Sequence, residues 1–219
     1  MRPLSMVDAF LPLGCVVAVG LKSEAALLPK GARILVSGGD PARLAAMLAA
    51  LPDDVTGVLS FGIAGGLAPT VAPGDLFIAT ALLTPSESFA ADPRWLADLS
   101  HRTLATPGIL AASDVLLSSV QAKQALHRAT QAMAVDMESG VAARFAASRG
   151  VPFAALRSVA DGPEDILPRA AAVGLNPDGS VAPLRVLAAL ARHPLELPAL
   201  IRLARSSAKA HAALRRALA

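Results

Sequence analysis

The sequence predicts an α/β sandwich with a largely parallel or mixed sheet and a helical C-terminal extension. Short apolar runs alternate with alanine-rich runs of helical character, and the apolar runs are nearly continuous instead of alternating with polar residues. Continuous apolar strands are typical of a sheet that is covered on both faces. Alternation of strands with helices indicates an α/β architecture. The last part of the chain differs from the rest in charge.

Six apolar runs are expected as strands: residues 15–20, 33–38, 57–63, 74–83, 133–137 and 151–159. Three runs are expected as helices: residues 40–51, 119–130 and 139–150. Asp40 is a suitable N-cap, with Pro41 at the first helical position. Ser139 lies near the start of the third helix, and Gly150 is its expected C-terminal stop.

Composition indicates one globular domain with a substantial core. The 219 residues are 54% hydrophobic and 17% charged, so disorder is not expected for most of the chain. The single cysteine, Cys15, excludes an internal disulfide and suits a reducing compartment. Lipidation at Cys15 is not expected because Pro12 stands where lipoprotein cleavage sites usually carry leucine. The uncharged run at 9–21 is too short to span a bilayer, so we expect a cytoplasmic protein.

The C-terminal part is basic. Residues 185–219 carry seven Lys or Arg and one Glu, whereas the whole chain has a net charge of +3. Apolar residues from Leu197 to Ala204 keep helical spacing, with Pro194 and Pro198 separating two helices. Such a tail can contact an anionic membrane surface reversibly. Alternatively, its apolar face packs on the domain or on a partner subunit.

Acidic residues follow the expected strands. Glu24 comes shortly after the first, Asp136 and Glu138 end a later one, and Asp161 follows the last. Ligands bind beyond the carboxyl ends of strands in such sheets, so these acids are candidates for one site. Ordinary structural roles are the alternatives: a first-turn acidic cluster for Asp136 and Glu138, and a turn at Asp161 and Gly162.

Two segments taken together indicate function more specifically than these single residues do. "FGIAGGLAPTVAPGDLFIAT" and "AVDMESGVAARFAASRGVPFAALRSVADG" occur in an order and at a spacing that resembles the nucleoside phosphorylase and nucleosidase family, from about Val16 to Gly162. The resemblance implies a three-layer α/β/α sandwich with a central mixed sheet and cleavage of an N-ribosidic bond. It also implies an oligomer, and we expect a homodimer.

The resemblance implies three acidic roles. Asp161 would protonate the purine at N7, Glu138 would hold the ribose hydroxyls, and Glu24 would activate water. The substrate-binding residues that it implies are Met137 on the sugar, together with Ile63, Ala64, Gly65, Leu116, Leu117 and Asp136. The chemistry needs such groups, because a glycosidic bond breaks through an oxocarbenium-like sugar and a purine leaves poorly unless it is protonated. We assign no chemical role to Asp136 and expect it only to brace the strand end.

Departures from the family pattern concern the nucleophile and the base. Ile63 stands at the expected position of a phosphate-binding hydroxyl, and Ser60 near that of an arginine, which favours water over phosphate. The sequence "GDPAR" follows the second strand instead of the first, so we interpret it as a helix start. Leu116 and Leu117 replace the usual aromatic residue, which predicts an aliphatic base pocket. Ala160 replaces a serine that often steadies the aspartate.

A narrower resemblance is to the hopanoid-associated phosphorylase branch, which implies adenosylhopane as the substrate. The compressed segment 86–112 and the long basic tail suggest it. We therefore expect a catalytic domain at 1–182 and a basic helical tail at 183–219.

The favoured hypothesis is hydrolytic release of adenine. Alternatives are phosphorolysis of the same bond, turnover of a soluble nucleoside such as methylthioadenosine, and a non-catalytic nucleoside- or lipid-binding module. No metal is expected, since the four histidines (His101, His127, His193 and His211) show no ligand spacing. The sequence contains no visible nucleic-acid-binding motif, so no such partner is expected, and no cofactor is expected either.

Overall fold

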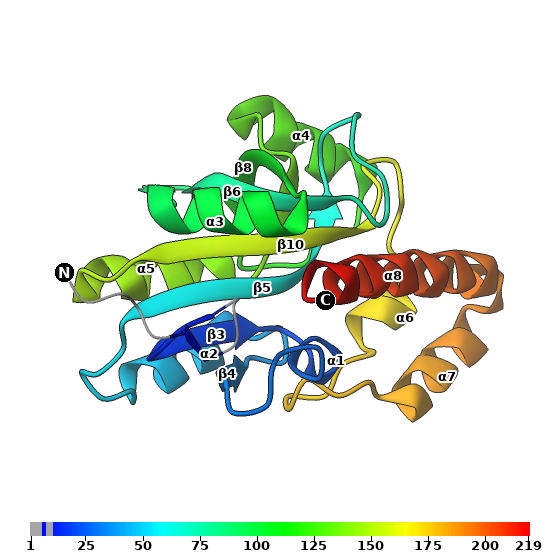
Figure 1. Ribbon diagram of the computed structural model, residues 1–219. Helices are drawn as coiled ribbons and strands as arrows, with labels where there is room; N and C mark the ends of the chain where they lie inside the picture. The colour runs from blue at the N-terminus through cyan, green and yellow to red at the C-terminus, as the bar shows by residue number, and fades with distance from the viewer. Residues whose placement is uncertain (1–5, 8–10) are drawn as a thin grey trace.

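A mixed eight-stranded sheet lies at the centre of the computed structural model, which describes residues 6–7 and 11–219, with helices on both faces (Figure 1). Its strands are β3 (Cys15–Val19), β4 (Arg33–Val36), β5 (Gly57–Gly66), β6 (Leu76–Leu83), β7 (Ser88–Ala90), β8 (Thr106–Ala112), β9 (Ala134–Asp136) and β10 (Phe153–Asp161). A separate antiparallel pair is formed by β1 (Met6–Val7) and β2 (Leu11–Pro12). The helices are α1 (Lys22–Ala25), α2 (Pro41–Ala49), α3 (Pro93–Thr103), α4 (Val120–Thr130), α5 (Ser139–Arg149), α6 (Arg169–Ala172), α7 (Pro183–Arg192), the 3-10 helix η1 (Pro194–Glu196) and α8 (Leu197–Ala217).

Part of the sheet closes on itself. The strand order is β10-β6-β8-β9-β5-β3-β4, and β10 also pairs with β5, so β5, β10, β6, β8 and β9 form a ring. The β5 strand pairs in parallel with β3 and β10, whereas its last two residues pair antiparallel with β9. The expected α/β sandwich with a mixed sheet is therefore confirmed. The glycine segment continues β5 to Gly66 instead of turning after residue 63.

Both faces of the sheet are covered. In β3, Val16 and Ala18 belong to the apolar cluster beneath α2 and α5. Val17 and Val19 belong to the cluster that includes residues of α3 and α8. All five residues of β3 are buried, which explains why the strands read as continuous apolar runs.

The segment 86–112, expected to be compressed, holds β7, α3 and β8. Asp92 caps α3 by accepting hydrogen bonds from the N–H groups of Arg94 and Trp95, and Pro93 occupies the first turn. The same pattern, an aspartate N-cap followed by proline, begins α2 at Asp40, where the sequence predicts the helix. β8 contains Pro107 and a glycine, both unfavourable in strand interiors, and was therefore missed.

The C-terminal helices differ in burial. α7 buries none of its residues, whereas α8 buries Ala210, Ala213 and Leu214, and this end of α8 lies against β10 and β5 (Figure 1). The expected break lies at Pro194, but Pro198 was placed wrongly: it occupies the first turn of α8, where the missing N–H costs nothing. The division of the chain at residue 182 stays a prediction.

No helix in the described part of the chain is both long and apolar enough to cross a membrane. Residues 1–5 and 8–10, which precede the segment considered for lipidation, lie outside the described residues.

Candidate active site

A cavity of about 180 Å³ opens at the carboxyl ends of β3, β5, β9 and β10. All ten residues selected from the sequence line it: Glu24, Ile63, Ala64, Gly65, Leu116, Leu117, Asp136, Met137, Glu138 and Asp161. Val115, Val135, Leu167 and Leu175 add to the apolar wall. Among the described residues, no Lys or Arg lines this cavity. The structure thus brings the selected residues together, while their roles stay predictions.

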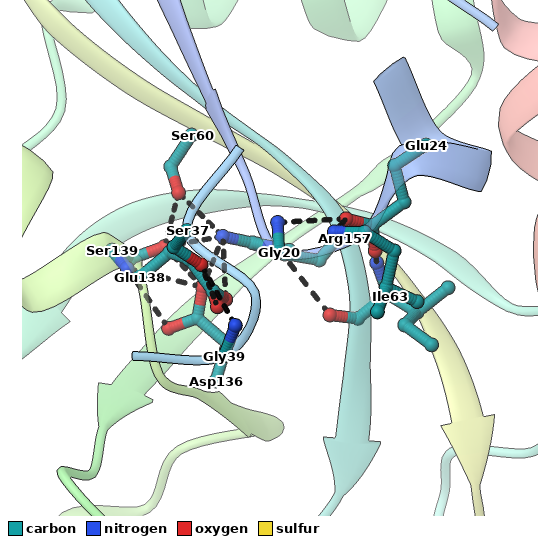
Figure 2. Close-up of polar contacts among 11 residues, drawn as sticks. Gly20, Glu24, Ser37, Gly39, Ser60, Ile63, Asp136, Glu138, Ser139 and Arg157 are labelled. Carbon is teal, nitrogen blue, oxygen red and sulfur yellow. Dashed lines mark hydrogen bonds and ion pairs between the residues drawn. The ribbon is translucent and has the colours of Figure 1, made fainter. Parts of the chain in front are cut away.

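Glu24 is buried against the backbone at the start of α1. Its Oε2 accepts hydrogen bonds from the N–H groups of Gly20 (2.9 Å) and Leu21 (2.8 Å), and its Oε1 accepts one from Ile63 (2.8 Å) (Figure 2). Burial raises the pKa of Glu24, and the nearby Arg157 opposes that rise. A buried carboxylate that faces a cavity and has a raised pKa is suited to accept a proton from water.

Close packing of Glu24 depends on Gly62 in β5. Gly62 has a φ of +148°, and a Cβ at this position would overlap both the Glu24 carboxylate and the Arg157 guanidinium. Glycine is therefore required for the carboxylate to approach the strand.

Glu138 lies between β9 and α5, where it is the N-terminal capping residue of α5. Its Oε1 accepts a hydrogen bond from Ser37 Oγ (3.0 Å), which in turn accepts one from the Gly39 N–H (3.0 Å) (Figure 2). Burial raises the pKa of Glu138 to about 7, with Arg157 opposing the rise and the Asp136 and Glu24 carboxylates adding to it.

Arg157 is fully buried in β10 and lies between the acids (Figure 2). It forms an ion pair with Asp136, lies 3.9 Å from a Glu138 oxygen, and donates hydrogen bonds to the hydroxyls of Ser60 and Ser139. A buried guanidinium needs such partners, because an unpaired charge in the core is costly.

The Asp136 carboxylate contacts the protein on several sides. Besides Arg157, it accepts hydrogen bonds from the Ser139 hydroxyl (2.5 Å) and the Ser139 N–H. Burial raises the pKa of Asp136, and Arg157 opposes that rise. Asp136 therefore holds Arg157 and the start of α5 in place.

Asp161 ends β10 and forms an ion pair with Lys123, a fully buried residue of α4. Burial raises the pKa of Asp161, Lys123 opposes the rise, and Asp165 adds to it. The apolar wall made by Leu116, Leu117 and Leu167 lies in the same cavity.

Sequence reasoning missed two cations and one loop. Arg157 is the only charged residue in the apolar run 151–159, and Lys123 lies three residues from both Val120 and Leu126 on the inner side of α4. Charges at such positions are rarely buried unless paired, which was the available signal. The "GDPAR" segment does begin a capped helix, since Asp40 accepts hydrogen bonds from the N–H groups at the start of α2. The adjoining Ser37 and Gly39 nevertheless belong to the site.

The family model described as "Phosphorylase superfamily" matches residues 26–178, well over half of the chain. The chain belongs to the phosphorylase superfamily. This membership confirms the expected class of enzyme, a nucleoside hydrolase or phosphorylase. No curated protein matches the sequence of this superfamily member.

Solved structures share the fold of this phosphorylase-superfamily chain. An S-adenosylhomocysteine nucleosidase from Streptococcus pyogenes is similar, with 19% identity and a TM-score of 0.62, over 68% of this chain and 84% of the nucleosidase. A Helicobacter pylori MTAN mutant with 5′-methylthioadenosine in its active site has 19% identity and a TM-score of 0.60, over 68% of this chain and 86% of the mutant chain. A futalosine hydrolase mutant, also from Helicobacter pylori, has 19% identity and a TM-score of 0.58, over 66% of this chain and 88% of the hydrolase chain.

Proposed function

We propose that this protein hydrolyses the N-ribosidic bond of an adenine nucleoside and releases adenine. The observation that carries the proposal is the composition of the cavity: Glu24, Glu138 and Asp161 line it from three separate segments, with an aliphatic wall beside them. Cleavage of a ribosidic bond to a purine needs a proton donor for the base and negative charge near the sugar. The nucleosidase structures of the same fold support this reaction class.

Each acid has one role in the proposed reaction. Asp161 donates a proton to N7 as the bond between C1′ and N9 breaks and its electron pair passes to the purine. Glu138 accepts hydrogen bonds from the ribose hydroxyls and stabilises the cationic sugar. Glu24 accepts a proton from the water whose oxygen bonds to C1′.

Water is favoured over phosphate by the charge of the cavity. Its described lining contains four carboxylates, counting Asp136, and no Lys or Arg. Ile63 offers no hydroxyl, and its N–H donates to Glu24. Ser60 is buried and bonded to Arg157 and Ser139. A phosphate dianion placed there would be repelled, because Arg157 does not line the cavity and is already paired with Asp136.

The substrate that we propose is adenosylhopane, with ribosylhopane as the sugar product. The proposal rests on the resemblance to the hopanoid-associated branch and is supported by the aliphatic cavity lining and by apolar residues at its rim. Val115 and Leu116 line the cavity and are 64% and 45% exposed, which suits a substrate with a large apolar substituent.

The deciding experiment is adenine release from adenosylhopane, methylthioadenosine and adenosine, each with and without inorganic phosphate. Release that does not depend on phosphate and leaves a free ribosyl product is the expected result. Strict dependence on phosphate would make the protein a phosphorylase. Binding of these nucleosides without base release would favour the binding module instead.

The rate of adenine release is expected to rise as pH increases through about 7, the pKa of Glu138. Glu138 must be ionised for its negative charge to stabilise the cationic sugar. Glu138→Gln should remove the contribution of Glu138 near pH 7 from this ascending limb, leaving only that of Glu24, and lower kcat/KM by about 10- to 100-fold, as measured by pH–rate profiles. Glu87→Gln, which alters an exposed carboxylate paired with Arg144, is the control. An unchanged limb in Glu138→Gln would contradict the assignment.

The same carboxyl group links stability to pH. Its pKa in the folded protein, about 7, lies above the ordinary value of 4.5. Its contribution to stability is therefore complete below pH 4.5 and is lost as pH rises to about 7. Glu138→Gln should accordingly melt at a higher temperature than the wild type at pH 8, a difference that calorimetry can measure.

We also propose that α7 and the start of α8 bind anionic membranes. Leu184, Leu187 and Leu195 are 80%, 60% and 93% exposed, and residues 185–219 carry a strong excess of Lys and Arg. Leu184→Ser combined with Leu187→Ser should reduce co-sedimentation with phosphatidylglycerol vesicles. Deleting the whole tail is unsuitable because α8 covers part of the core.

The control for the vesicle experiment is Leu104→Ser, which changes a leucine that is 89% exposed and lies at the end of α3. Equal sedimentation of the double variant and this control would contradict membrane binding. A homodimer stays a prediction, which light scattering on the purified protein can test.

A further inference from the structure

Lys123 is a buried cation that does not line the cavity yet touches the residue proposed to act as the general acid. It is fully buried, and its Nζ donates to Asp161 Oδ2, to the carbonyl oxygen of Gly162 (2.7 Å) and to that of Asp165 (2.9 Å). Three acceptors match the three protons of an ammonium group. The lysine is therefore held in one position by the end of β10 and the loop that follows.

This loop is closed around the lysine. The Asp165 side chain accepts a hydrogen bond from the Gly162 N–H (2.7 Å), and the Leu167 N–H donates to the carbonyl oxygen of Ser118 (3.0 Å). The two segments that carry the aliphatic wall of the cavity are thereby joined next to Asp161.

The two oxygens of Asp161 have different surroundings. Oδ2 is occupied by Lys123, whereas Oδ1 accepts no hydrogen bond from the described residues. Because Asp161 lines the cavity, Oδ1 is the oxygen available to a bound base.

We propose that Lys123 is a positioning residue that sets the acid strength of Asp161. By holding Oδ2, it leaves the proton on Oδ1, and it stabilises the carboxylate that forms when this proton passes to N7 of the base. The proton leaves Oδ1, the base gains it, and Lys123 stays protonated throughout. The inference rests on the proposed function, in which Asp161 is the proton donor.

The surroundings of Asp161 agree with this role. The charged groups that act on it are Lys123 of α4 and Asp165 of the following loop. Burial raises the pKa of Asp161 and Asp165 adds to the rise, whereas Lys123 opposes both. Without the lysine, Asp161 would hold its proton more tightly and donate it less readily.

The test measures the titration of the Asp161 carboxyl carbon by NMR in protein labelled with ¹³C-aspartate, without substrate. The Asp161→Asn variant identifies the signal. In Lys123→Met, the Asp161 titration should move to higher pH by about one unit or more, a tenfold weaker acid. Lys123→Arg, which keeps the charge, should titrate near the wild type. Arg102→Met, which removes a cation from the surface pair with Asp98, should leave the signal unchanged.

Activity provides a second readout. In Lys123→Met, adenine release should fall by about 10- to 100-fold. The decrease of its rate at high pH, where Asp161 loses the proton that it donates, should move to higher pH. An Asp161 titration that is the same in the wild type and in Lys123→Met would overturn the proposal, even if activity were lost. If Lys123→Met does not fold, the comparison is made with Lys123→Gln. A wild type that releases no base from any nucleoside would instead refute the proposed function, because the NMR titration needs no turnover.

Discussion

Replacing Asp161 with Asn is expected to lower the rate of adenine release by about 10²- to 10⁴-fold, the usual range for loss of a general acid. The amide cannot donate an acidic proton to N7, yet it has nearly the same shape, and its oxygen can still accept a hydrogen bond from Lys123. Substrate binding should change much less than kcat. Single-turnover measurements of adenine release, with circular dichroism to check the fold, test this prediction.

The matched control is Asp54→Asn, which makes the same chemical change in an exposed ion pair with Arg33 and should leave the rate unchanged. Full activity of Asp161→Asn would remove Asp161 from the mechanism. If activity is lost together with the circular dichroism signal of the folded protein, the comparison has to be repeated at a temperature where the variant is folded.

Replacing Arg157 with Leu is expected to destabilise the protein by about 3–5 kcal/mol, the usual cost of removing one partner from a buried ion pair. Asp136 and Glu138 would lose the cation that offsets their burial, and the hydroxyls of Ser60 and Ser139 would lose a donor. Urea unfolding at pH 8, where carboxyl groups are most costly to bury, should reveal the largest difference.

A surface pair provides the comparison. Arg144→Leu breaks the exposed pair with Glu87 and should cost less than about 1 kcal/mol. Adding Asp136→Asn to Arg157→Leu should recover part of the lost stability, because one uncompensated carboxyl group is removed. Equal stability of Arg157→Leu and Arg144→Leu would mean that the buried cation contributes nothing to the fold.

Local patterns were sufficient to predict most of the sheet and the acidic residues of the cavity. Continuous apolar runs located β3 and β10, and the rule that ligands bind at the carboxyl ends of strands placed Glu24 and Asp161 at one edge. These inferences need only the residues of one segment and its place in the order of strands.

Pairings between distant segments could not be predicted in this way. Lys123 and Asp161 are 38 residues apart, and nothing near either one identifies the other as its partner. The pairing of β10 with both β5 and β6 likewise follows from the curvature of the whole sheet. β8 was not predicted for a local reason, since Pro107 is unfavourable within a strand. The strand forms nevertheless, because the parallel pairing of β8 with β6 compensates for the proline.

The closed ring of strands has a consequence for how this enzyme can acquire new substrates. β5 pairs with β3, β9 and β10, so a change in its backbone would displace the segments that carry all three acids at once. Residues 113–119 and 162–168 lie outside the ring, between its strands and the neighbouring helices. Exchange of the 113–119 loop with that of related enzymes is therefore the route by which substrate preference can diverge while the bond-breaking chemistry is inherited unchanged, whereas the 162–168 loop holds Lys123 beside Asp161 and has to be kept.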